Sequence, residues 1–129
     1  MSEAEKPKLE KDCDEMMESL ADYEVSPDEA QSRATKFLAL SYRVNSKIKS
    51  VKNEIIKAKV LATTSYASAF NGVDEKANVS KAKALASANP EHLKQNVLLQ
   101  KLEAEESYWK NAFEIMNNGH IFYKILTRS

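Results

Sequence analysis

Apolar residues recur at helical spacing through a long stretch that has no helix breaker in its interior. Between Pro27 and Gly72 the chain contains neither proline nor glycine. Ser26 suits a helix N-cap, Pro27 the first helical position and Glu29 the third position of a capping box. The pattern therefore predicts one continuous helix over residues 26–70, on the order of 65 Å long at about 1.5 Å per residue.

Two heptad registers run along this helix and together make one apolar seam. A seam of this length must be covered by other helices, and 129 residues are too few to wrap around it. We therefore expect some of the covering helices to come from another copy of the chain. The predicted oligomer seam comprises Phe37, Val44, Ile48, Val51 and Ile55.

Shorter helices are predicted on both sides of the long one. In the acidic segment 1–25, Leu9, Cys13 and Met16 fall on one stripe, which indicates a short amphipathic helix. The remaining residues, 26–129, are predicted to form a helical core domain. This domain continues after the long helix with a loop over 71–80 and helices over 81–88 and 90–127.

The few helix breakers predict where the chain is interrupted. Asn71-Gly72 predicts the end of the long helix, with Gly72 as a left-handed cap. Asn117-Asn118-Gly119 predicts a break or kink in the last helix. With only two glycines and three prolines in all, the composition favours long helices over a sheet. The expected fold class is all-α: one very long basic helix packed with shorter helices in an oligomeric bundle.

Charge is distributed unevenly although the net charge is zero. Residues 1–29 hold eleven acidic and three basic residues, whereas residues 30–59 hold eight basic residues against Glu54 alone. A solvated helix normally mixes signs to gain i,i+4 pairs, so this asymmetry favours contact with a polyanion or an acidic protein. Basic stems beside a seam also simply reach into water, and that interpretation stays open. The candidate phosphate contacts are Arg43, Lys47, Lys49, Lys52, Lys57 and Lys59, with Tyr42 and Tyr66 as candidate stacking groups.

Patterns typical of enzymes and metal proteins are missing from the sequence. Glycines at positions 72 and 119 alone cannot form a phosphate-binding loop. His92 and His120 are far apart and have no cysteine or carboxylate cluster at metal-ligand spacing. The acidic surroundings of Cys13 raise the pKa of its thiol and weaken it as a nucleophile. We therefore predict a protein that is not an enzyme, with no catalytic residue, cofactor or metal.

Targeting signals are missing as well. No cationic and apolar leader opens the sequence, and no apolar run approaches the ~20 residues that span a bilayer. A single cysteine excludes an intramolecular disulfide and fits a reducing compartment. We therefore expect a cytoplasmic location and no membrane partner.

The order of features from Glu29 onward resembles the UvsY-like recombination mediators of tailed phages. The likeness covers about three quarters of the 129 residues and is a match of pattern rather than of one sharp motif. It is carried by Asp28-Glu29-Ala30, Leu40-Ser41-Tyr42, the basic heptad from Lys47-Ile48-Lys49 to Lys59, Phe70-Asn71-Gly72, Tyr108-Trp109, and Asn117-Asn118 before Ile121-Phe122-Tyr123-Lys124.

The resemblance implies a specific function. Members of the family are small helical proteins that assemble into rings, bind single-stranded DNA, contact the phage single-strand-binding protein and help load a RecA-type recombinase. For a phage protein the location is the host cytoplasm. The sequence departs from the family late in the long helix, where Thr63 to Ser68 carries no base. DNA contacts must then come from the bases between Arg43 and Lys59, or from Lys76, Lys81 and Lys83.

A second hypothesis belongs to another class. The protein is then a non-enzymatic helical adaptor or inhibitor that binds another protein and self-associates. In this case the basic helix pairs with the acidic residues 1–29 of a neighbouring subunit, so that assembly neutralises both surfaces.

Overall fold

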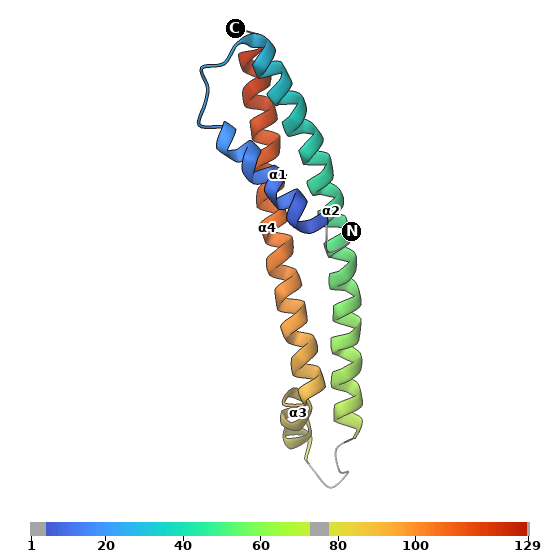
Figure 1. The fold of residues 1–129 in the computed structure, drawn as a ribbon. Helices are drawn as coiled ribbons and strands as arrows, with labels where there is room; N and C mark the ends of the chain where they lie inside the picture. Colours follow the sequence, from blue (N-terminus) through green and yellow to red (C-terminus); the bar gives the residue numbers. More distant parts are fainter. Residues whose placement is uncertain (1–4, 73–77, 129) are drawn as a thin grey trace. The chain divides into compact units, whose positions relative to one another are not determined.

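The computed structural model describes residues 5–72 and 78–128, and within these ranges it contains four helices and no strand (Figure 1). The helices are α1 (Glu5–Ser19), α2 (Pro27–Asn71), α3 (Val79–Ser87) and α4 (Pro90–Leu126). The predicted all-α class is confirmed, with a long helix, α2, that packs against other helices. Residues 73–77 of the predicted 71–80 loop lie outside the described residues.

A short polar residue precedes each of the last three helices and caps it. Ser26 Oγ accepts a hydrogen bond from the backbone N–H of Glu29 at 3.1 Å, at the start of α2. Asn78 caps α3 in the same manner, and Asn89 Oδ1 accepts from the N–H of Glu91 at 3.0 Å at the start of α4. These side chains satisfy N–H groups that have no partner within the helix.

The chain forms two compact units. The terminal unit comprises residues 1–50 and 107–129, and the hairpin unit comprises residues 51–106. Helices α2 and α4 each contribute one part to either unit, whereas α1 belongs to the terminal unit and α3 to the hairpin unit.

The terminal unit has a core of large side chains. The rings of Phe37 and Tyr123 stack with their centroids 5.7 Å apart, and so join α2 to α4. Helix α1 inserts its predicted apolar stripe into the same core, where Cys13 is fully buried. Large side chains buried in this unit come from all three of its helices: Leu9, Phe37, Trp109, Met116 and Tyr123.

The hairpin unit buries mostly small side chains. Its α2 residues Ala58 and Ala62 are buried, and α3 buries Ala82 and Ala86. Beside them only Val51 and Ile55 are larger buried hydrophobic residues among those the structure describes in this unit. Eight larger aliphatic side chains are exposed instead: Ile56, Val60, Leu61, Val79, Leu85, Leu93, Val97 and Leu98.

The predicted oligomer seam is part of the core of a single chain. Phe37, Val44, Ile48, Val51 and Ile55 are each between 0% and 7% exposed. Helices of the same chain cover these residues, so no second copy is needed to bury them. The expectation that some covering helices come from another copy stays a prediction. Any contact between copies has to use a different surface.

Gly119 brings two helices close together and does not interrupt α4. Helix α4 runs unbroken from Pro90 to Leu126, and Gly119 is buried within it. A Cβ atom at this position would lie 2.6 Å from the ring of Phe37, which is closer than side chains pack. The predicted break at Asn117-Asn118-Gly119 is therefore wrong.

Gly72 also differs from its prediction. It has no positive φ, so it is not the left-handed cap that Asn71-Gly72 indicated. Its N–H donates to the carbonyl of Ser68 at 3.0 Å, which continues the i→i−4 bonding of α2.

The two histidines of α4 fix its antiparallel pairing with α2. In the terminal unit His120 Nδ1 lies 3.0 Å from the carbonyl oxygen of Ala34, and in the hairpin unit His92 Nδ1 lies 3.0 Å from that of Ala62. A carbonyl oxygen only accepts hydrogen bonds, so Nδ1 carries the proton in both rings. The histidines are 28 residues apart, as are the alanines, so the pairing in each unit follows the same heptad register.

Candidate nucleic-acid interface

The predicted phosphate contact Lys47 lies inside the terminal unit. Lys47 is only 6% exposed, and it already interacts with other groups of the protein. It follows Leu40, which is also buried, by seven residues, so both lie on the covered side of α2. Lys47 is not accessible to a nucleic acid in this arrangement and leaves the candidate set.

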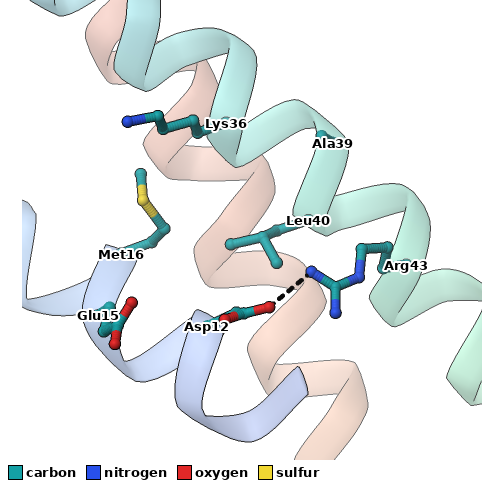
Figure 2. Close-up of a pocket in the computed structure, with 7 residues that line it drawn as sticks. All are labelled: Asp12, Glu15, Met16, Lys36, Ala39, Leu40 and Arg43. Carbon is teal, nitrogen blue, oxygen red and sulfur yellow. Dashed lines mark hydrogen bonds and ion pairs between the residues drawn. The ribbon is translucent and has the colours of Figure 1, made fainter. Parts of the chain in front are cut away.

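Arg43 is held by a carboxylate of α1. Figure 2 shows its Nη1 directed at Asp12 Oδ2, and the two atoms are 2.8 Å apart. The pair borders a hollow of about 360 Å³ whose lining also includes Glu15 and Lys36. The two acidic side chains come from α1 and the two basic ones from α2 (Figure 2), so the charges around this hollow largely cancel. A phosphate that binds Arg43 must compete with Asp12, which engages Nη1 of the guanidinium.

The other four candidates are exposed side chains of α2 without an ion pair to any described residue: Lys49, Lys52, Lys57 and Lys59. Lys49, Lys52 and Lys59 follow one another at spacings of three and seven residues, so they share one side of the helix. Glu54 lies about 160° around the helix from Lys52 at 3.6 residues per turn. The three lysines form a basic stripe that no acidic residue of α2 interrupts, and Lys57 lies on another side.

The two candidate stacking tyrosines differ in their availability. Tyr42 is 67% exposed on α2, so its ring is open to a base. Tyr66 is partly buried and stacks on Phe70, with the two ring centroids 6.4 Å apart. It also makes an edge-to-face contact with His92, whose ring centroid is 5.2 Å from that of Tyr66. Tyr66 is therefore a packing residue of the hairpin unit.

A polar network around Arg33 was missed by the sequence analysis. Arg33 Nε donates to Glu29 Oε1 at 3.0 Å, and Nη2 donates to Asp22 Oδ2 at 3.2 Å. Its Nη1 donates to the hydroxyl of Tyr123 at 3.1 Å, and the one proton of that hydroxyl is shared between the backbone carbonyls of Ser19 and Asp22. Both carbonyls also lie within hydrogen-bond distance of Arg33 Nη1. The network ties the link after α1 to α2 and α4. The i,i+4 spacing of Glu29 and Arg33 was a visible signal, but Tyr123 follows 90 residues later.

Burial explains the inertness expected of Cys13. Burial raises the pKa of its thiol to about 11 from 9.0, while Arg43 lowers it and the carboxylates of Asp14 and Asp12 raise it further. The neighbouring charges thus matter less than the burial, which the sequence did not reveal. The thiol is protonated at neutral pH and cannot act as a nucleophile there.

Ser65 and His92 lie close together but cannot act as a nucleophile and its base. Ser65 Oγ is 3.3 Å from His92 Nδ1, and that nitrogen donates its own proton to the carbonyl of Ala62. The Ser65 hydroxyl donates to the same carbonyl at 3.0 Å. His92 Nε2 is 3.2 Å from Asn96 Nδ2, so the ring is satisfied on both sides. The cluster joins α2 to α4.

No group of three or more histidine, cysteine, aspartate or glutamate side chains suited to a metal ion occurs in residues 5–72 and 78–128. Over the same part of the chain, each helix is too short or too polar to cross a bilayer. The exposed basic stripe offers lysine ammonium groups, which bind anionic oxygens.

Comparison with protein-family models, with curated proteins and with solved structures gives no match for this chain.

Proposed function

We propose that the protein is a single-stranded DNA-binding recombination mediator that helps to load a RecA-type recombinase. The observation that supports binding is the basic stripe on α2, formed by the exposed lysines Lys49, Lys52 and Lys59, with no acidic residue of α2 on that side. The role in loading rests on the sequence resemblance. The partners in this proposal are single-stranded DNA, the recombinase and the single-strand-binding protein.

The stripe suits phosphate binding without base recognition. Lysine ammonium groups neutralise phosphates of any sequence, so the expected preference among bases is small. Three phosphate contacts on a single strand correspond to a log–log salt slope of about −2. Because Lys47 is buried and Arg43 is paired with Asp12, these two residues contribute less than the sequence analysis expected.

A titration of labelled oligo(dT) at several salt concentrations tests the proposal. We expect Lys52→Ala with Lys59→Ala to weaken binding to all sequences and to flatten the slope by about 1.4, since two phosphate contacts are lost. Lys124→Ala, an exposed lysine near the end of α4, serves as the matched control and should change neither quantity. The proposal would be contradicted if wild-type protein did not bind oligo(dT) at low salt, or if its affinity for oligo(dT) did not change with salt concentration.

The alternative function, a non-enzymatic helical adaptor, is favoured by the contact between α1 and α2. The Asp12–Arg43 pair shows an acidic segment of this chain meeting the basic helix, although within one chain and not between neighbouring subunits. Removal of residues 1–24 does not separate the two functions, because Leu9 and Cys13 belong to the core.

Asp12→Asn is a cleaner test of the two functions. Under the DNA proposal it frees Arg43, which lies on the side of α2 away from Lys52 and about 40° around the helix from Lys57. Oligo(dT) then gains a phosphate contact on this second side of α2, and its affinity rises. Under the adaptor alternative neither wild type nor variant binds oligo(dT). Asp14→Asn is the matched control, because it removes the same charge from α1 without an ion pair to Arg43.

A further inference from the structure

One face of α4 in the hairpin unit combines exposed aliphatic side chains with two lysines. Val97 is 50% exposed and Leu98 is 44% exposed. Together with Lys94, Gln95 and Lys101 they line a surface hollow of about 380 Å³. The oxygen Oε1 of Gln95 is buried and has no hydrogen-bond partner among the described residues. This face is thus open and incompletely satisfied.

In the terminal unit the corresponding stripe of α4 lies next to α1, although its residue Tyr108 is still 43% exposed. Tyr108 follows Lys101 by seven residues and Lys94 by fourteen, so the three share one heptad position. Tyr108 lies beside α1: burial raises the pKa of its hydroxyl, and the carboxylates of Asp14 and Glu10 raise it further. In the hairpin unit the same stripe is basic and uncovered.

Helix α1 is therefore an example, within this chain, of an acidic amphipathic helix packed on a long helix. It buries Leu9 and Cys13, which are four residues apart. Around this stripe it presents carboxylates, of which Asp12 pairs with Arg43. The open face offers the complementary pattern, since Val97 and Leu98 lie between two lysines about 10 Å apart along the helix at 1.5 Å per residue.

We propose that the face formed by Lys94, Val97, Leu98 and Lys101 docks a short acidic amphipathic helix of another protein. Two apolar residues one turn apart would cover Val97 and Leu98, while carboxylates on either side would reach the two lysines. Burial of the aliphatic groups supplies affinity, and the lysines select an acidic helix.

Two other occupants fit the face less well. Residues 92–102 contain no aspartate or glutamate, so a symmetric contact between two copies would bring lysine against lysine. Single-stranded nucleic acid uses aromatic rings for stacking, and the lining residues are aliphatic, polar or basic. The proposal concerns α4 and does not rest on DNA binding by the stripe of α2.

Fluorescence anisotropy with the full-length protein tests this docking. The probe is a labelled peptide with the sequence of residues 5–24, and a second peptide has its acids replaced by asparagine and glutamine. We expect the acidic peptide to bind, the neutral peptide to bind much more weakly, and Lys94→Glu with Lys101→Glu to lower affinity for the acidic peptide about tenfold or more. Val97→Ser with Leu98→Ser should cause a similar loss.

Lys81→Glu with Lys83→Glu is the matched control, because it makes the same change of charge on exposed residues of α3. It should leave peptide affinity within about twofold of wild type, since rim charges off the site matter little. Lys94→Glu with Lys101→Glu should bind a peptide whose acids are replaced by lysine, which shows that charge and not misfolding controls the docking. Oligo(dT) binding should be retained by this variant, so failure here is distinguishable from failure of the DNA proposal.

Several outcomes would overturn the docking proposal. One is that the acidic peptide does not bind. Another is that it binds equally to wild type and to the Lys94→Glu, Lys101→Glu variant, as it would if the peptide replaced α1 in the terminal unit. A third is light scattering that shows a wild-type dimer which this variant dissociates. A fourth is a loss of oligo(dT) affinity in this variant with no change in peptide affinity.

Discussion

The terminal and hairpin units use the same two long helices but bury different kinds of side chain. The terminal unit encloses Trp109, Tyr123 and Phe37. The hairpin unit encloses alanines such as Ala62 and Ala86 and exposes leucine, isoleucine and valine side chains. Burying a large side chain contributes about 1.5–3 kcal/mol, whereas an alanine contributes much less. Most of the stability should therefore reside in the terminal unit.

The two units also differ in whether their charged side chains are paired within the chain. In the terminal unit the charged groups Arg33, Arg43 and Asp12 are already paired with one another or with nearby polar groups. In the hairpin unit Lys52, Lys59 and Lys94 are exposed and have no ion pair to a described residue. Exposed basic side chains next to exposed aliphatic ones form a candidate binding surface. We expect the hairpin unit to carry most of the interactions, together with Lys49 of the terminal unit.

The largest expected effect comes from removing the biggest buried ring of the terminal unit. Trp109→Ala should lower the free energy of unfolding by about 3–5 kcal/mol, because it leaves a large cavity. Leu98→Ala in the hairpin unit, at a residue that is 44% exposed, should change it by no more than about 0.5 kcal/mol. Urea denaturation followed by circular dichroism measures both. Equal losses for the two variants would remove the contrast between the units.

Removing the hydroxyl of Tyr123 should have the second largest effect on stability. Tyr123→Phe removes a group that accepts from Arg33 and donates to the carbonyls of Ser19 and Asp22. The two carbonyls keep Arg33 Nη1 as a donor, so the main loss is the hydrogen bond between the hydroxyl and the charged guanidinium. This loss should cost about 1.5–3 kcal/mol. The link after α1 should also become more sensitive to proteolysis. Tyr108→Phe, whose hydroxyl takes no part in this network, is the control, and comparable losses for both would show that the network is not responsible.

Gly119→Ala tests the close approach of α4 to Phe37. Alanine is the better helix former by about 1 kcal/mol, so a helix without tertiary contacts would be stabilised. Here the added Cβ meets the ring at 2.6 Å, and overpacking of this kind costs about 1–3 kcal/mol. We expect a net loss of stability by urea denaturation. Asn118→Ala, on the exposed side, should be neutral or stabilising, and a stabilised Gly119→Ala variant would contradict the packing.

The smallest effect concerns Cys13 and its ionisation. Because the folded pKa is about 11 and the ordinary value is 9.0, the folded protein holds this proton more tightly than the unfolded chain. The stabilisation is complete below pH 9 and is lost as pH rises from 9 to about 11. At pH 8 the folded thiol should react slowly with a disulfide reagent and quickly after unfolding in urea. A rate in the native protein equal to that of unfolded protein would show that α1 does not shield it.

Features set by neighbouring residues could be predicted from the sequence. The start of α2 follows from Ser26 and Glu29, which form the predicted cap, and the absence of breakers explains its continuation to Asn71. The all-helical class follows from the same local signals. These features depend on backbone groups within a few residues, so periodicity and capping reveal them.

Features set by distant residues could not be predicted in the same way. The sequence pattern revealed the apolar seam on α2, but it did not reveal that helices of the same chain cover this seam. Gly119 was taken for a breaker because its partner, Phe37, lies on another helix. Lys47 was taken for a surface base because heptad position alone does not tell which flank of α2 other helices cover. Burial of the seam, of Gly119 and of Lys47 depends on contacts between residues that are far apart in the sequence.

Native-state hydrogen exchange, with and without oligo(dT), tests the division between the units most directly. Amides around Trp109 and Phe37 should exchange slowly, through global unfolding, and amides of α3 and the adjoining start of α4 should exchange much faster. Oligo(dT) should slow exchange in the part of α2 that carries Lys49 to Lys59 and leave the amides of α1 unchanged. Uniform protection of both units, or DNA-dependent protection confined to α1, would contradict the account.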